Sequence, residues 1–286
     1  MHVTFWHSDK PRERILAAAF AEGVKAHGDD FETRALRPEI EVADCDVAIM
    51  VGVKSRGLFR AHHAAGAHVI YMDKGYTRHA GKGPVKTWEY WRVAVDAHQP
   101  TAYFMRENRP ADRWERLGLS FLPWRRSEPG DYILLAGSSQ KYHDFYGLSD
   151  PTKYASKIVY HLSQISRRPI IYRPKPSWKE ALPVPGAAFS RGNEQIGDLL
   201  PRTAILVTHG SNACFDAALA GVPSICLGPA VAVPISSTSF DDILAPRESS
   251  ESERLQWAAN LAYCQWTQPE MASGEMWRYV RAELYR

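Results

Sequence analysis

The sequence has little cysteine and no long apolar run, and each absence excludes a class of protein. The cysteines are scattered, which argues against a zinc knuckle and favours buried, reduced thiols. There are four of them: Cys45, Cys214, Cys226 and Cys264. No segment approaches the roughly 20 apolar residues that cross a bilayer. The opening residues, MHVTFWHSDK, have no signal-peptide core, so we expect a cytoplasmic protein that does not enter a membrane.

Strong overall charge is also absent, since the formal net charge is only +3. The distribution is uneven, however, because residues 54–92 contain eight basic and two acidic side chains. Tyrosine and tryptophan alternate with these cations, a mixture typical of surfaces that bind nucleic acid or acidic glycans. The plainer interpretation is a solvated basic surface with the aromatic rings in the core, and the sequence leaves both open.

The first half of the chain alternates between strand and helix patterns. Apolar runs at residues 2–6, 47–53 and 68–72 predict strands, and the spacing of apolar residues over 11–27 and 55–65 predicts helices. Continuous apolar strands separated by helices are typical of a doubly wound parallel sheet.

The second half repeats this rhythm. Strands are predicted at 132–136, 169–172 and 204–208, with helices at 150–164 and 213–220. A chain of 286 residues is long enough for two domains of about 130 residues each. The polar, proline-containing segment 106–129 interrupts the alternation, so we place the connection at residues 127–130.

The segment at residues 204–228, AILVTHGSNACFDAALAGVPSICLG, predicts a strand, a turn, a helix and a second strand. The turn at residues 209–212 leaves backbone N–H groups at the start of a helix, and this end of a helix attracts phosphate. Asp216 lies one helical turn further on, on the same face as Asn212, where it can accept hydrogen bonds from a ribose. An ordinary βαβ unit without a ligand gives the same pattern.

Two other strands of the second half also end in residues suited to a phosphate. The first is followed by Gly137, Ser138 and Ser139, and the second by the sequence Arg173-Pro174-Lys175-Pro176. Parallel strands end at one edge of their sheet, so we expect these turns to converge on one ligand. Surface solvation is the alternative for both cations.

The segment HGSNACFDAALAGVP resembles the nucleotide-sugar-binding segment of GT-B glycosyltransferases. Asp216 stands where that family usually has Glu, and RPKP resembles the family's RPHP-like sequence, with Lys175 in place of His. The resemblance implies an α/β fold of two Rossmann-like, doubly wound parallel-sheet domains that face a central cleft. It implies domains at 1–128, joined by a C-terminal helix at 268–286, and at 129–267. It also implies donor-binding roles for Gly137, Ser138, Ser139, Arg173, Lys175, His209, Gly210, Ser211, Asn212 and Asp216.

The same resemblance implies a catalytic base in the first domain. Asp73 ends a strand there and is our preferred base for deprotonating an acceptor hydroxyl, with His7 as the competing residue. A structural role for Asp73, as a loop cap or as a partner of Lys74, is the alternative. We expect the acceptor to contact Lys74, Tyr76, Arg78, Trp91 and Arg92.

The compact chain and its basic aromatic segment resemble phage enzymes that glycosylate hydroxymethylated pyrimidines in DNA. This interpretation predicts a UDP-sugar as co-substrate and double-stranded DNA as partner. It also predicts a monomer or weak dimer in the cytoplasm, which for a phage enzyme is the cytoplasm of the host. The alternatives are a transferase acting on a bacterial surface polysaccharide or lipid-linked glycan, a nucleotide-sugar epimerase, and a non-catalytic protein that binds nucleic acid or nucleotides. We expect no tightly bound cofactor, and we expect that a metal ion is not required or only assists the reaction. The pair Asp44 and Asp46 resembles a metal-binding pair, but it precedes its strand and suits a capping role.

Overall fold

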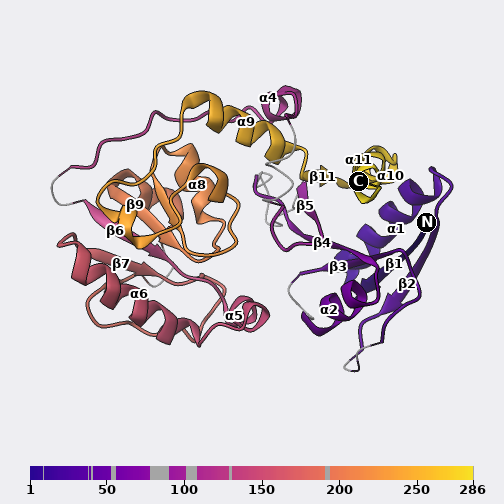
Figure 1. The fold of residues 1–286 in the computed structure, drawn as a ribbon, viewed down its shortest axis with the longest axis horizontal. Helices are drawn as coiled ribbons and strands as arrows, with labels where there is room; N and C mark the ends of the chain where they lie inside the picture. Colours follow the sequence, from indigo (N-terminus) through magenta and orange to yellow (C-terminus); the bar gives the residue numbers. More distant parts are fainter. Residues whose placement is uncertain are drawn as a thin grey trace. The chain divides into compact units, whose positions relative to one another are not determined.

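The structure is a computed structural model of the chain. It describes residues 1–8, 10–37, 39, 41–52, 56–77, 90–100, 108–128, 131–190 and 194–285. The chain forms two units, one of residues 1–100 with 261–286 and the other of residues 101–260 (Figure 1).

The first unit is built on a six-stranded sheet with the strand order β11-β5-β4-β3-β1-β2. Four strands are parallel: β1 (His2–His7), β2 (Asp30–Ala35), β3 (Val47–Val51) and β4 (His68–Lys74). The other two are β5 (Tyr90–Val95), antiparallel to β4, and β11 (Gln265–Thr267), antiparallel to β5. The expected parallel core is therefore present, with two antiparallel strands added at one edge.

Helices cover both faces of this sheet, because the central strands are apolar on both sides. Ile49 of β3 packs in the cluster that contains the apolar residues of α1 (Pro11–Lys25), whereas its neighbour Met50 packs with Leu58 of α2 (Arg56–Ala64). The helices α10 (Gln268–Ala272) and α11 (Glu275–Leu284) lie beside α1 (Figure 1).

The sequence pattern near the end of the chain predicts two long helices, at residues 252–266 and 269–285, and the structure differs from this prediction. Helix α9 (Glu251–Ala262) ends early, because residues 265–267 pair with β5 instead, Trp266 lying opposite Trp91. The second helix is divided into α10 and α11 at Gly274, whose φ of 80° lies in the left-handed region that a helix cannot continue through.

The second unit contains a five-stranded sheet, parallel throughout, with the order β10-β9-β6-β7-β8. Its strands are β6 (Tyr132–Ala136), β7 (Ile170–Arg173), β8 (Ala188–Phe189), β9 (Thr203–Thr208) and β10 (Ser224–Cys226). The long helix α6 (Pro151–Ile165) covers one face, and α8 (Ala213–Leu219) and α9 lie on the other (Figure 1). Two sheets with helices on both faces confirm the expected doubly wound α/β class.

Shorter elements complete this unit. They are α4 (Asp112–Arg116), α5 (Gln140–Tyr146), α7 (Ile196–Leu199) and the 3-10 turns η1 (Leu200–Arg202), η2 (Val233–Ile235) and η3 (Phe240–Ile243). A further short element, which the sequence pattern predicts at residues 102–105, lies outside the described residues.

Residues 108–128 belong to the second unit, whereas the sequence analysis placed them in a first domain that ends at residue 128. The rings of Trp114 and Phe121 stack at 5.4 Å, and Phe121 also contacts Trp257. The backbone N–H of Leu122 donates to the carbonyl of Leu219 at 2.9 Å. The polar composition that suggested a linker therefore belongs to a segment anchored by its few aromatic residues.

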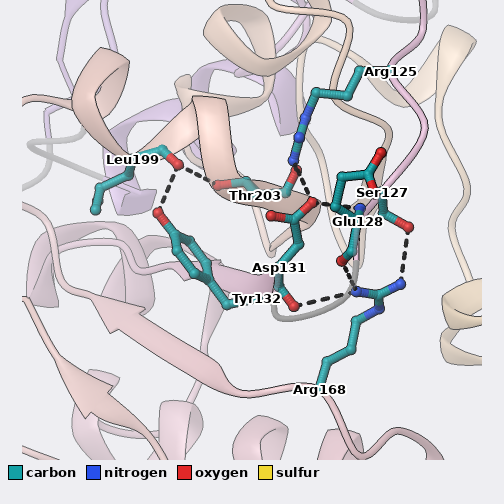
Figure 2. A network of polar contacts seen from close by, with 8 residues as sticks. All are labelled: Arg125, Ser127, Glu128, Asp131, Tyr132, Arg168, Leu199 and Thr203. Carbon is teal, nitrogen blue, oxygen red and sulfur yellow. Dashed lines mark hydrogen bonds and ion pairs between the residues drawn. The ribbon is translucent and has the colours of Figure 1, made fainter.

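A polar network fixes the end of this segment to the amino-terminal edge of the second sheet (Figure 2). Asp131 is its centre, since it accepts hydrogen bonds from the backbone N–H of Glu128 at 2.7 Å and from the Arg125 guanidinium at 3.1 Å. Although burial acts in the opposite direction, these bonds lower the pKa of Asp131. Arg168 closes the network through the carbonyls of Glu128 and Asp131 and the hydroxyl of Ser127.

No helix among the described residues has the length and apolar content needed to span a membrane.

Candidate functional site

Three turns of the second unit lie next to one another at the carboxyl edge of its sheet. Ala136, the last residue of β6, pairs with Arg173 of β7 on one side and with Thr208 of β9 on the other. Since adjacent strands are about 4.8 Å apart, the ends of β7 and β9 are separated by roughly 10 Å. One nucleotide can reach across this distance. The three turns are adjacent, as the sequence analysis expected. Their role in binding a nucleotide sugar stays a prediction.

The turn after β6 is held against the neighbouring strand. The backbone N–H of Gly137 donates to the Arg173 carbonyl at 2.9 Å, and Ser138 is buried. Ser139 is the N-cap of α5, and its carbonyl accepts from the N–H groups of Tyr142 and His143. The start of α5, a helix that the sequence analysis did not predict, therefore follows directly on this turn.

The turn after β9 is fixed by a chain of hydroxyl contacts. The hydroxyl of Thr208 donates to the carbonyl of Ala136 at 2.9 Å and accepts from the N–H of Ser211 at 2.9 Å. The hydroxyl of Ser211 accepts in turn from the N–H of Ala213 at 3.3 Å. Gly210 is buried within this turn. The loop is thus shaped by its own sequence before any ligand is considered.

Helix α8, which follows this turn, has only seven residues. Asn212 occupies its N-cap position without a side-chain capping bond, and Asp216 lies half-buried in its first turn. A helix this short provides only a small dipole. The ribose contact of Asp216 stays a prediction.

His209 is the most constrained side chain of this edge. Its Nδ1 lies 2.7 Å from the hydroxyl of Tyr154, and the rings of Tyr142 and Tyr146 lie 6.0 and 6.2 Å from its own. Burial, together with the nearby His143, lowers the pKa of His209 to about 4. The ring is therefore neutral at ordinary pH, and it acts as a hydrogen-bonding group rather than as a cation.

A small cavity of about 10 Å³ lies beside this ring, at the lower limit of what admits a single water molecule. Tyr172 borders it, with its ring against Gly137 and its hydroxyl buried without a hydrogen-bond partner among the described residues. Burial, helped by the charge of Asp150, raises the pKa of Tyr172 to about 12, so the phenol keeps its proton. His143 and Tyr154 also line the cavity.

The sequence analysis did not select Tyr154, Tyr172 or His143. One sequence feature could have indicated Tyr172 as a site residue, since it ends the predicted strand just before Arg173. No comparable sequence feature indicates Tyr154 or His143, because their positions depend on how α5 and α6 pack against the strand ends.

The two cations at the carboxyl end of β7 differ in their surroundings. Arg173 is half-buried and donates from Nη2 to the carbonyl of Glu194 at 3.2 Å. Lys175 is exposed, and its carbonyl accepts from the N–H of Trp178 in a turn. Arg173 is therefore held against the segment that follows β8 through the carbonyl of Glu194.

In the first unit, Asp73 and His7 lie at the same edge of the sheet, since β1 and β4 are parallel and β3 alone separates them. The carboxylate of Asp73 is 39% exposed and lies 3.6 Å from the guanidinium of Arg92. It also accepts from the N–H of Lys74 at 2.8 Å. His7 is half-buried, with Nδ1 3.3 Å from the carbonyl of Ser8. Either residue can accept a proton, and neither role is tested by these contacts.

The structure does not support an exposed acceptor surface formed by Tyr76, Trp91 and Arg92. All three are buried, with exposed fractions of 3%, 7% and 2%. The hydroxyl of Tyr76 donates to Gln99 at 2.7 Å, and Arg92 donates to the same oxygen at 3.0 Å. Their side chains stabilise the first unit from inside, which is the plainer of the two interpretations of this segment. Lys74 is half-buried, and Arg78 lies outside the described residues.

Within the described part of the chain, no cluster of three or more histidine, cysteine, aspartate or glutamate side chains has the arrangement of a metal site. Asp46 accepts a hydrogen bond from the backbone N–H of His2, the first residue of β1, at 2.7 Å, so this contact links two strands rather than capping a helix or turn.

Two solved structures share this fold along nearly the whole chain. KpsC of Thermosulfurimonas dismutans, described as a beta Kdo 2,4 transferase, has a TM-score of 0.55 and 14% sequence identity, with 93% of this chain and 91% of that one covered. A second KpsC structure from that organism, described as a beta Kdo 2,7 transferase, has a TM-score of 0.57 and 12% identity, with 98% and 100% covered. The fold is therefore that of the GT-B glycosyltransferases. No sequence-family profile matches the chain, and no curated protein matches it either.

Proposed function

We propose that this chain is a glycosyltransferase that moves a sugar from a nucleotide-activated donor to an acceptor hydroxyl. The observation that carries the proposal is the carboxyl edge of the second sheet, where the turns after β6, β7 and β9 follow adjacent strands. Open α/β sheets bind ligands at this edge. The edge presents backbone N–H groups, hydroxyls, a guanidinium and a neutral imidazole, which together suit a phosphate-linked sugar.

In this proposal the nucleotide sugar binds the second unit. The turn residues Gly137–Ser139 and His209–Asn212 contact the phosphates, and Arg173 offsets their charge. Asp216 holds the ribose. A UDP-sugar is our first candidate donor, and the experiment below compares it with the other nucleotides.

The acceptor hydroxyl needs a base, and we assign this role to Asp73 of the first unit, with His7 as the alternative. The base takes the hydroxyl proton while the acceptor oxygen attacks the anomeric carbon and the phosphate leaves with the bonding electrons. The exposed carboxylate of Asp73 is accessible to such a proton, and Arg92 holds it in place from inside the unit.

For the acceptor we favour a glycan hydroxyl over a base in DNA. The DNA hypothesis depended on the basic aromatic segment, and three of its proposed contacts, Tyr76, Trp91 and Arg92, are buried. The two KpsC structures with this fold are described as a beta Kdo 2,4 transferase and a beta Kdo 2,7 transferase. Hydroxymethylated DNA stays the competing acceptor, supported by the seven other basic residues of this segment, at positions 54–86.

The proposal is tested by incubating the protein with a panel of nucleotide sugars and two acceptors, a mixture of oligosaccharides and hydroxymethylated DNA, followed by mass spectrometry. A mass increase of one sugar on an oligosaccharide supports the glycan acceptor, and an increase on a DNA nucleoside supports the DNA acceptor. Affinity for DNA that falls steeply with salt, without transfer from any donor, favours the non-catalytic nucleic-acid-binding alternative.

A further inference from the structure

The phenol of Tyr154 and the imidazole of His209 form a contact that neither motif analysis nor fold likeness assigns. Tyr154 lies in the first turn of α6, whose N-cap is Asp150, and its Oη lies 2.7 Å from Nδ1 of His209. The two rings meet edge to face, with centroids 5.4 Å apart and planes at 88°. This contact joins helix α6 to the turn after β9.

The direction of this hydrogen bond follows from the surroundings of the hydroxyl. Burial raises the pKa of Tyr154 to about 12, so the phenol carries its proton at neutral pH. Within the described residues, Nδ1 of His209 is the one group that receives that proton. If Nδ1 carried a hydrogen itself, the phenolic proton would be left buried without an acceptor, which is costly. The contact therefore favours Nδ1 as acceptor, and the ring hydrogen resides on Nε2.

A second contact fixes the rotation of the ring. A Cβ atom at position 228 would lie 2.2 Å from Nε2 of His209, so the edge of the ring rests directly against Gly228. Nε2 makes no hydrogen bond to a described residue, and both His209 and Gly228 are only partly buried. The Nε2–H group thus lies at the ends of β9 and β10, next to the turns that carry the proposed donor site.

The side chains that face this imidazole do not favour its protonation. They come from two helices: Tyr142, His143 and Tyr146 from α5, and Tyr154 from α6. Burial lowers the pKa of His143 as well, so this neighbour is also neutral. None of the four carries a negative charge at neutral pH that would hold an imidazolium.

We propose that Tyr154 is a positioning residue, which holds His209 as the neutral Nε2–H tautomer so that this N–H binds a phosphate oxygen of the nucleotide donor. The identity of the ligand rests on the proposed function, whereas the state of the ring does not. Tyr154 touches no reacting atom and acts only through His209.

The first test reads the ring directly, by nitrogen NMR of protein labelled at histidine with ¹⁵N. His209→Gln identifies the His209 signals by their loss. In the wild type we expect Nδ1 without a hydrogen and Nε2 with one, unchanged between pH 8 and pH 5. Tyr154→Phe is expected to mix the two tautomers, and Tyr160→Phe, an exposed position on the same helix, is expected to leave them unchanged. A wild-type signal with hydrogen on Nδ1, or identical signals in Tyr154→Phe, overturns the proposal.

The second test measures the Kd of the same proteins for UDP, TDP, GDP, ADP, CDP and CMP by calorimetry. We expect Tyr154→Phe to raise the Kd of the nucleotide that binds the wild type by about twofold, because roughly equal mixing of the tautomers halves the population of the Nε2–H form. Tyr160→Phe is expected to keep the wild-type Kd. Equal Kd values for wild type and Tyr154→Phe overturn the link between Tyr154 and the donor. If the wild type has the expected tautomer but binds no nucleotide, the ligand assignment and the proposed function fail together, while the NMR result still decides the role of Tyr154 in orienting the ring.

Discussion

The indole Nε1 of Trp277 donates a hydrogen bond to Oδ2 of Asp29 at 2.8 Å, across 248 residues of sequence. Both side chains are buried, and Arg281 adds an ion pair to the same carboxylate at 3.1 Å. These contacts attach helix α11, near the end of the chain, to the unit that the first 100 residues form. The sequence analysis expected this return from a family resemblance, but the residues that make it could not be identified from the sequence.

We therefore predict that Trp277→Phe destabilises the first unit. The substitution removes the hydrogen bond to a buried carboxylate, a loss of about 1–3 kcal/mol, and adds a smaller loss of packing. Urea unfolding followed by circular dichroism measures the change. Tyr285→Phe, at an exposed position just after the same helix, is the control and is expected to unfold with the wild type. An unchanged midpoint for Trp277→Phe would show that the bond contributes nothing.

A second prediction concerns the cation after β7. Arg173→Ala is expected to weaken nucleotide binding by roughly tenfold or more, because a guanidinium next to phosphate contributes a charge-assisted hydrogen bond. Calorimetry measures the Kd. The matched control is Arg202→Ala, since Arg202 is exposed and precedes β9, at the opposite edge of the same sheet. If both variants lost the same nucleotide affinity, the effect would come from the long-range charge of the arginines and not from a contact between Arg173 and the phosphate.

The third prediction is a pH dependence of stability. The folded protein lowers the pKa of His209 to about 4, chiefly through burial, and also lowers the pKa of His62 and His143 for the same reason. The unfolded chain therefore binds more protons than the folded one below the ordinary histidine pKa of about 6.5. Stability is complete above that value and falls as the pH decreases from about 7 toward 5.

Urea unfolding at pH 7, 6 and 5 measures this slope. His209→Gln is expected to be less stable at pH 7 and to show a shallower slope, because one of the three histidines no longer titrates. A slope of the opposite sign, or one unaffected by His209→Gln, would mean that the buried imidazole is not neutral.

Catalysis gives a fourth prediction. Asp73→Asn is expected to reduce the rate of sugar transfer by about 10²–10⁴-fold, the usual contribution of a general base, with an unchanged Kd for the nucleotide. Transfer is measured by mass spectrometry of the acceptor and binding by calorimetry. Loss of transfer in His7→Gln, with normal turnover in Asp73→Asn, would assign the base to His7.

Much of the fold could be predicted because the strands are short, continuous apolar runs. Val47–Val51 and Tyr132–Ala136 are buried along their whole length, as the apolar runs in the sequence predict. By contrast, β11 has three residues within a helical pattern, and it forms a strand only because β5 offers an unpaired edge. Such tertiary pairing leaves no signal in the local sequence.

The site divides in the same way. Residues that follow strands, such as Arg173 and His209, could be predicted because parallel strands end at one edge. Tyr154 could not, since its contact with His209 depends on the packing of α6 against the sheet. Arg92 was wrongly predicted to lie on an acceptor-binding surface. Alternating basic and aromatic residues look the same in a sequence whether they line a surface or, as here, lie buried around Gln99.

The central claim is that the carboxyl edge of the second sheet binds a nucleotide sugar, and amide NMR during titration with nucleotide sugars tests it most directly. The account predicts that one donor shifts the amide signals of residues 137–139 and 209–212 together, at a single Kd, and that this response is weakened in Arg173→Ala. Binding that leaves these signals unmoved while shifting others, or no binding by any nucleotide sugar, would contradict it.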